Sequence, residues 1–177
     1  SYANDVIVSN AATVDSAIEN PRERDTLALS IRGPLSPENL ITDSRQAMSG
    51  SDGQFSFLGK KVSENALRSL TLPVSDDTVK QWIEPTTFVQ SDNPKLIARA
   101  KAILGSEKDA FKVSSKISRW VYEYVSTTFS ARLTNSLEVL DHMEGDCTEH
   151  SMLFVGLARA AGLPAREVAG LIYVDSP

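Results

Sequence analysis

The chain has 177 residues, of which 41% are hydrophobic and 23% are charged. This composition is close to the globular average, and it excludes wholesale disorder, collagen-like repeats and coiled coil. There are 18 Lys and Arg residues against 23 Asp and Glu, which gives a net charge of −5. Phosphate binding needs a basic face, so we expect no nucleic-acid partner, and the same balance disfavours an anionic membrane.

The longest apolar stretch of note, residues 152–155, is far shorter than the roughly 20 residues that cross a bilayer, so no membrane insertion is expected. The first residues lack the basic and apolar segments of a signal peptide, but a removed signal peptide would leave no trace. The localisation is therefore open between the cytoplasm and a bacterial envelope.

Residues 1–85 predict a β-rich or irregular N-terminal region. Residues 26–32 alternate polar and apolar side chains, as a half-buried strand does, and end at Gly33-Pro34. Residues 55–62 are a second candidate strand, which follows the turn-forming stretch 49–53, and residues 67–74 are a third. No function can be read from this region.

Residues 86–177 form the second predicted region, and from residue 94 its apolar period is helical. One helix is expected over residues 94–104 and another over residues 110–127, followed by a short helical turn at 136–140. The first carries Leu96, Ile97, Ala100 and Ile103 on its predicted buried face, and the second carries Val113, Ile117, Trp120, Val121 and Tyr124.

Residues 144–164 contain the start and stop signals of a further helix. Asp146 is a favourable N-cap, and Glu149 follows three residues later, as in a capping box. Gly162 supplies a C′ residue, and Pro164 prevents continuation. Cys147 is therefore expected to be the first helical residue.

Cys147 is the chain's single cysteine, which excludes an intramolecular disulfide and a multi-cysteine zinc site. At a helix start its sulfur would face unpaired backbone N–H groups and the positive end of the macrodipole, which together favour thiolate. The same N–H groups can receive an oxyanion. Two interpretations stay open on these residues alone: a nucleophile, or a small buried residue that happens to start a helix.

The segment Gly145-Asp146-Cys147-Thr148-Glu149-His150 is followed by Leu153-Phe154, by residues 157–166 (LARAAGLPAR) and by residues 168–173 (VAGLIY). This pattern closely resembles the transglutaminase-like superfamily of cysteine enzymes. The resemblance extends over roughly residues 90–177.

The resemblance implies an α+β fold with a papain-like core, in which the Cys-bearing helix packs on an antiparallel sheet. It implies a Cys-His-Asp triad, of which it places Cys147 here as the catalytic nucleophile. Residues 169–174 would begin the first strand of that sheet, and the family's His and Asp lie further along. We therefore expect only the helical half and first strand of the core, truncated before the catalytic His and Asp.

The implied function is thiol-dependent acyl chemistry on the amide or peptide bonds of a protein or peptide substrate, without a cofactor. Bacterial members suggest a protease or amidase more than a cross-linking transglutaminase. The chain as given is expected to be inactive because it lacks a general base. The alternative is a non-catalytic interaction module in which the cysteine only packs.

Other candidate residues are weaker. His150 lies one turn after Cys147, but the family does not use this position as the base, so we expect a structural role; His142 should be solvated. Together with Cys147 these two histidines could meet a metal ion, but no second ligand pair exists, so no metal is expected. Arg159 and Arg166 are expected to make surface and turn-fixing ion pairs.

Residues 169–174 are apolar and strand-prone, and in the family another strand pairs with their edge. The helix face around Ser151, Phe154, Val155 and Ala158 would also be partly bare. We therefore expect self-association through residues 169–174, or a complementing segment from another polypeptide.

Overall fold

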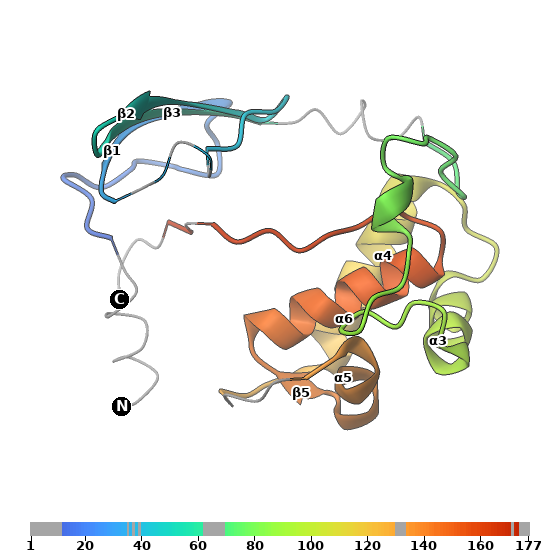
Figure 1. Cartoon of the computed structure of the whole chain (residues 1–177). Helices are drawn as coiled ribbons and strands as arrows, with labels where there is room; N and C mark the ends of the chain where they lie inside the picture. Colours follow the sequence, from blue (N-terminus) through green and yellow to red (C-terminus); the bar gives the residue numbers. More distant parts are fainter. Residues whose placement is uncertain are drawn as a thin grey trace. The chain divides into compact units, whose positions relative to one another are not determined.

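The structure is a computed structural model that describes residues 12–34, 36, 38, 40–61, 70–129, 134–170 and 172–173. The chain divides into two compact units (Figure 1). One unit contains Ser1–Ala66 with Tyr173–Pro177, and the other is Leu67–Ile172.

The first unit is built on a three-stranded antiparallel sheet of β1 (Thr26–Arg32), β2 (Gln46–Ser51) and β3 (Gln54–Lys60) in the order β1-β3-β2. Asp52 and Gly53 join β2 to β3 with φ angles of 52° and 76°. Positive φ at both positions is the pattern of a type I′ hairpin turn, and Asp-Gly is a favoured pair for it. The local sequence therefore fixes the β2–β3 register.

One face of this sheet is apolar because its side chains alternate along each strand. Ile31 lies opposite Phe55, and Leu29 lies opposite Phe57, so these four side chains share a face. Phe55 is the most buried of them, with 3% of its surface exposed. The β-rich prediction is thus confirmed for residues 26–32 and, as β3, for most of residues 55–62.

The predicted third strand at residues 67–74 is wrong for the residues that the structure describes there. Residues 67–69 lie outside the described residues, and Thr71 makes only an isolated bridge with Asp109. The third strand is instead β2, which includes residues 49–51 of the predicted turn. Its small and polar residues give a weak strand signal, and the hairpin with β3 supplies the pairing.

The second unit is mainly helical (Figure 1). Along the chain it contains η2 (Lys80–Trp82), α3 (Pro94–Leu104), α4 (Ala110–Tyr124), β4 (Ser126–Thr127), α5 (Ser136–His142), β5 (Glu144–Gly145) and α6 (Cys147–Ala160). Helix α6 contacts α3, α4 and α5, and it is the most buried of the four. Helices and an antiparallel sheet in one chain confirm the α+β class.

The helices of the structure begin and end close to their predicted residues, but two residues that were predicted to be buried are exposed. In α3 the buried residues are Leu96, Ala100 and Leu104, at i, i+4 and i+8, whereas Ile97 is 44% exposed. In α4 the terminal Tyr124 is 59% exposed, and its ring stacks on that of Trp120. Trp120 is half-buried and packs against the helical core.

The predicted strand at residues 169–174 does not form in the residues described there. Leu171 and Val174 lie outside the described residues, and residues 169, 170, 172 and 173 are not in a strand. Val168 and Ile172 are 63% and 88% exposed. A strand needs a hydrogen-bonding neighbour, and no described residue forms a backbone–backbone hydrogen bond with this segment; the Tyr173 hydroxyl instead accepts the Ile18 N–H at 2.9 Å.

The face of α6 that was expected to be partly bare is also largely covered. Val155 and Ala158 are 3% and 0% exposed, because α6 is enclosed by its neighbouring helices. Ser151 is exposed and Phe154 is half-buried, so the bare part is limited to these two positions.

Helix α6 is capped at both ends as predicted. Asp146 accepts the N–H of Thr148 at 2.7 Å, and Glu149 accepts the N–H of Asp146 at 2.8 Å, which completes the capping box. At the other end Gly162 has φ of 81°, and the N–H groups of Gly162 and Leu163 bond to the carbonyls of Arg159 and Ala158. This is a Schellman motif.

Gly156 of α6 packs closely against Ser136 of α5, and its replacement should destabilise the helical unit. A Cβ atom there would lie 2.9 Å from Cβ of Ser136, which is fully buried. We expect Gly156→Val to lower the free energy of unfolding by about 2 kcal/mol, the usual scale of core overpacking. Urea unfolding measures this, with Gly170→Val as the control because no atom lies near its Cβ. Equal midpoints for the two variants would contradict the packing.

The cap of α6 gives a second stability prediction. Asp146→Ala removes the acceptor of the Thr148 N–H and should cost about 1 kcal/mol of unfolding free energy. Asp146→Asn keeps a side-chain oxygen in the same place and should retain most of the stability. Urea midpoints of the two variants test this, and an alanine variant as stable as the asparagine variant would show that the cap contributes nothing.

Candidate active site at the start of α6

Cys147 is the first residue of α6, and it is exposed. The chain reaches it through β5, which pairs in parallel with β4 directly after α4. The N–H of Ser126 bonds to the carbonyl of Met143, and the N–H of Thr128 bonds to that of Gly145, both at 2.9 Å. The start of α6 is therefore fixed to the end of α4 by a backbone ladder.

Gly145 allows the capping box to close tightly. A Cβ atom at Gly145 would collide with Cβ and Cγ of Glu149. Without it, the Glu149 side chain folds back over the helix start, where it is only 6% exposed and holds the N–H of Asp146. Gly145, Asp146 and Glu149 together set the direction in which the Cys147 side chain leaves the helix.

The backbone around Cys147 leaves one donor free. The Cys147 N–H makes no hydrogen bond to any residue that the structure describes, as expected for the first N–H of a helix. The Cys147 carbonyl accepts the Ser151 hydroxyl at 2.7 Å. A free N–H beside an exposed sulfur can bind the oxygen of a carbonyl that the sulfur attacks.

His150 is held by two carbonyl groups. Its Nδ1 lies 2.7 Å from the Asp146 oxygen, and its Nε2 lies 3.2 Å from the Val125 oxygen. Val125 caps α4, so the imidazole joins the start of α6 to the end of α4. Both ring nitrogens face backbone carbonyls, and a neutral imidazole donates to one of the two, which supports the predicted structural role.

The structure also bears on His142 and on the possibility of a metal site. His142 is exposed at the end of α5. Among the described residues, no group of three or more His, Cys, Asp or Glu side chains is gathered closely enough to hold a metal ion. Likewise, none of the described helices is long and apolar enough to cross a bilayer.

The two arginines differ from their predicted roles as ion-pair residues. Arg159 is 7% exposed, and its guanidinium donates to the carbonyls of Ala165 and Glu84, both at 2.8 Å. Burial lowers the pKa of this guanidinium, and the charge of Glu167 acts in the opposite direction. Arg166 instead lies over the ring of Trp82, 5.1 Å from its centroid.

Arg159 therefore anchors the chain that leaves α6, a role that the sequence analysis missed. A signal for its burial was present, because Arg159 continues the stripe of Met152 and Val155 at i+7 and i+4. A long side chain on an apolar stripe can bury its stem and bring its head to backbone carbonyls.

The comparisons with known proteins agree with this arrangement. Residues 97–176 match the model of the transglutaminase-like superfamily. An uncharacterized protein of Haemophilus influenzae is 30% identical over 98 residues, which cover 52% of this chain and 26% of that protein. The chain thus spans about a quarter of the length of this curated relative.

A solved structure also matches the fold. It is the crystal structure of a "Putative Cysteine Protease from Cytophaga hutchinsonii", with a TM-score of 0.50 and 16% sequence identity. The match covers 79% of this chain and 53% of that one. The solved structure shows similarity of fold, and the match to the family model confirms the resemblance predicted from the residues around Cys147: residues 97–176 are similar to the transglutaminase-like superfamily.

Proposed function

We propose that the protein carries out thiol-dependent acyl chemistry on amide or peptide bonds, with Cys147 as the nucleophile. The observation that carries this proposal is the position of an exposed, single cysteine at the first residue of a capped helix, beside its own free N–H. The match of residues 97–176 to the transglutaminase-like superfamily model supports the same chemistry.

The reaction has two halves. The Cys147 thiolate adds to the carbonyl carbon, and the oxygen takes the negative charge beside the Cys147 N–H. The C–N bond then breaks, the amine leaves with a proton from a general acid, and a thioester remains. Water attacks the thioester in hydrolysis, and the carboxylate product and the thiol are released; an amine in place of water gives transamidation. Hydrolysis is the better proposal, on the fold-level analogy with the family.

The N-terminal end of α6 is expected to stabilise negative charge on the Cys147 sulfur and on the oxygen of the attacked carbonyl. The carboxylates of Asp146 and Glu149 also lie at this end, and both accept backbone N–H groups. Their negative charge is partly offset by the aligned backbone dipoles at the helix start, which also face the Cys147 sulfur and the oxygen of the attacked carbonyl.

We propose that the general base comes from outside residues 1–177. The chain has two histidines, of which His142 is exposed and His150 has both ring nitrogens on backbone carbonyls. The matched solved chain is longer than this one, so a family His and Asp have room in a longer polypeptide. Residues 1–177 alone are expected to show no turnover.

Association through residues 169–174 stays a proposal. Exposed Val168 and Ile172 support it, because apolar side chains next to unpaired backbone favour pairing with another chain. A protein or peptide substrate likewise follows from the proposed chemistry.

The rate of alkylation tests whether the Cys147 sulfur is a reactive nucleophile. Because Cys147 is the single cysteine, any label incorporated by iodoacetamide reports on this site alone. We expect native protein at pH 7 to react faster than the same chain unfolded in urea, since unfolding removes the helix dipole. A native thiol that reacts more slowly than the unfolded one would contradict the nucleophile and favour the non-catalytic module.

Turnover tests the assignment of residues. In the longest natural polypeptide that contains this chain, Cys147→Ala should lower kcat/KM on a peptide amide by at least about 1,000-fold. His150→Ala should lose much less, because its ring holds backbone rather than the reacting atoms. His142→Ala is the matched control and should be unchanged. Turnover that survives Cys147→Ala would place the chemistry elsewhere, and a His150 variant as inactive as Cys147→Ala would make His150 the base.

A further inference from the structure

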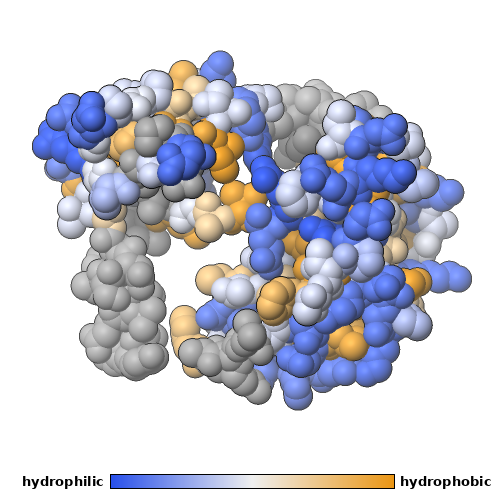
Figure 2. Space-filling view, viewed as in Figure 1, coloured by the Kyte–Doolittle hydropathy of each residue, from blue (hydrophilic) through white to orange (hydrophobic). Residues whose placement is uncertain are grey.

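Basic residues gather on two neighbouring helices of this acidic chain. Between residues 94 and 124 lie seven of the 18 Lys and Arg residues but three of the 23 Asp and Glu residues. The net charge of the whole chain is −5, so this segment is a positive region on a negative protein. Figure 2 shows that the visible face of the helical unit is mainly hydrophilic, with small apolar areas between.

Three of these cations share one face of α4. Lys112, Lys116 and Arg119 stand at i, i+4 and i+7, and all three are exposed. No carboxylate of a described residue lies within ion-pair distance of any of them. In contrast, Lys95 on α3 is paired with Asp141 at 2.8 Å. We call these three residues the basic face of α4.

Helix stability alone does not favour this arrangement. Like charges at i and i+4 repel each other, and Lys112 stands in the first turn of α4, where a cation opposes the macrodipole. Two acidic residues precede the helix, but both are engaged by backbone: Glu107 accepts the N–H groups of Lys108 and Asp109, and Asp109 accepts that of Lys112. The cations are therefore only partly neutralised.

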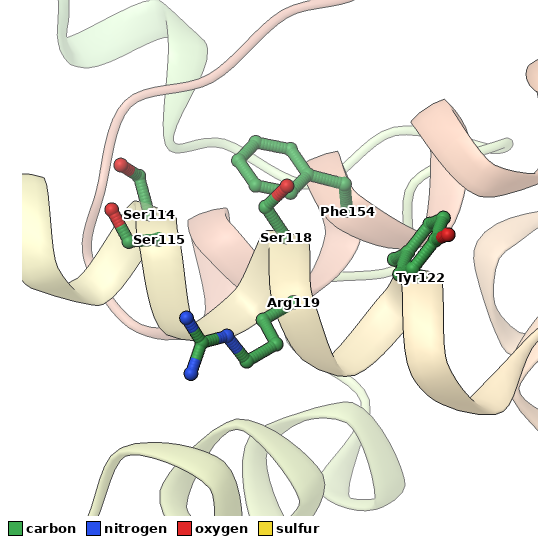
Figure 3. A pocket seen from close by; sticks show the side chains of 6 residues that line it. All are labelled: Ser114, Ser115, Ser118, Arg119, Tyr122 and Phe154. Atoms are coloured by element: carbon green, nitrogen blue, oxygen red, sulfur yellow. The ribbon is translucent and has the colours of Figure 1, made fainter.

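A groove adjoins the basic face. It has a volume of about 640 Å³, and Figure 3 shows Phe154 of α6 over Ser118, with Tyr122 towards one end. The lining residues are Ser114, Ser115, Ser118, Arg119, Tyr122 and Phe154. Arg119 belongs to both the groove and the basic face, and Tyr122 is 83% exposed. The surface thus offers cations beside two aromatic side chains.

We propose that the basic face of α4 and this groove dock an acidic polypeptide segment that carries an aromatic or large apolar side chain among its acids. The carboxylates pair with Lys112, Lys116 and Arg119, and the apolar side chain enters between Tyr122 and Phe154. This binding does not depend on the chemistry proposed for Cys147.

The size of the surface favours a polypeptide over other polyanions. Residues 112 and 116 are about 6 Å apart along the helix axis, which is close to the spacing of roughly 7 Å between acids at alternate positions of an extended chain. Nucleic acids are bound through longer rows of phosphate contacts, and anionic membranes through clusters of about 4–8 basic residues. The three cations of the basic face of α4 are fewer than either of those surfaces needs.

Peptide binding tests the proposal. The probe is a fluorescein-labelled 12-residue peptide that alternates Glu with Ser and has Phe at its centre, titrated with the 177-residue chain at low and at physiological salt. We expect saturable binding that weakens with salt. The triple variant Lys112→Glu, Lys116→Glu, Arg119→Glu should bind at least about 10-fold more weakly, and Tyr122→Ala at least about 3-fold.

The control is Arg32→Glu, Lys60→Glu, Lys61→Glu, which makes the same charge change on exposed residues of the other unit and should bind within about 2-fold of the unchanged chain. Equal losses in both triple variants would overturn the proposal in favour of general charge attraction. Tighter binding to a DNA duplex or to phosphatidylserine vesicles than to the peptide would also overturn it.

Discussion

The arrangement of the helical unit depends on how α6 begins. The helix is enclosed by α3, α4 and α5 over most of its length, so its exposed end is the part available for chemistry. The Asp146 and Glu149 capping box fixes the first turn, and the β4–β5 ladder fixes the chain before it. Because both constraints meet at Cys147, the sulfur is exposed on a backbone that is held from both sides.

The other end of α6 is held in a different way. The Schellman motif at Gly162 satisfies the last carbonyls, and buried Arg159 donates to carbonyls of Ala165 and Glu84. A buried cation is costly unless its donors are satisfied, so the chain that follows α6 is tied to the segment after η2. The basic face of α4 lies outside this framework, and of its three cations Lys116 donates to the Leu104 carbonyl at the end of α3.

Much of the helical unit could be predicted from the sequence because its signals are local. The N-caps, the capping box and the C′ glycine each act within a few residues, and the bounds of α3 and the start of α6 follow from them. The predictions missed strand β2 and expected a strand at residues 169–174 that the described residues there do not form, because strand formation depends on a distant partner. The predicted burial of Ile97 and Tyr124 was wrong because periodicity identifies the apolar face of a helix, whereas burial depends on which neighbouring helix covers that face. The interactions of Arg159 and His150 could not be read for the same reason, since their partners Glu84 and Val125 are remote in sequence.

The central claim is that Cys147 forms a covalent bond with the acyl group of a substrate. Mass spectrometry of the longest natural polypeptide containing this chain, mixed with an activated peptide ester and quenched in acid, tests it most directly. The account predicts one acyl group per protein, located on Cys147, released by hydroxylamine and absent in Cys147→Ala. An adduct on another residue, or rapid turnover of the ester without dependence on Cys147, would contradict the account.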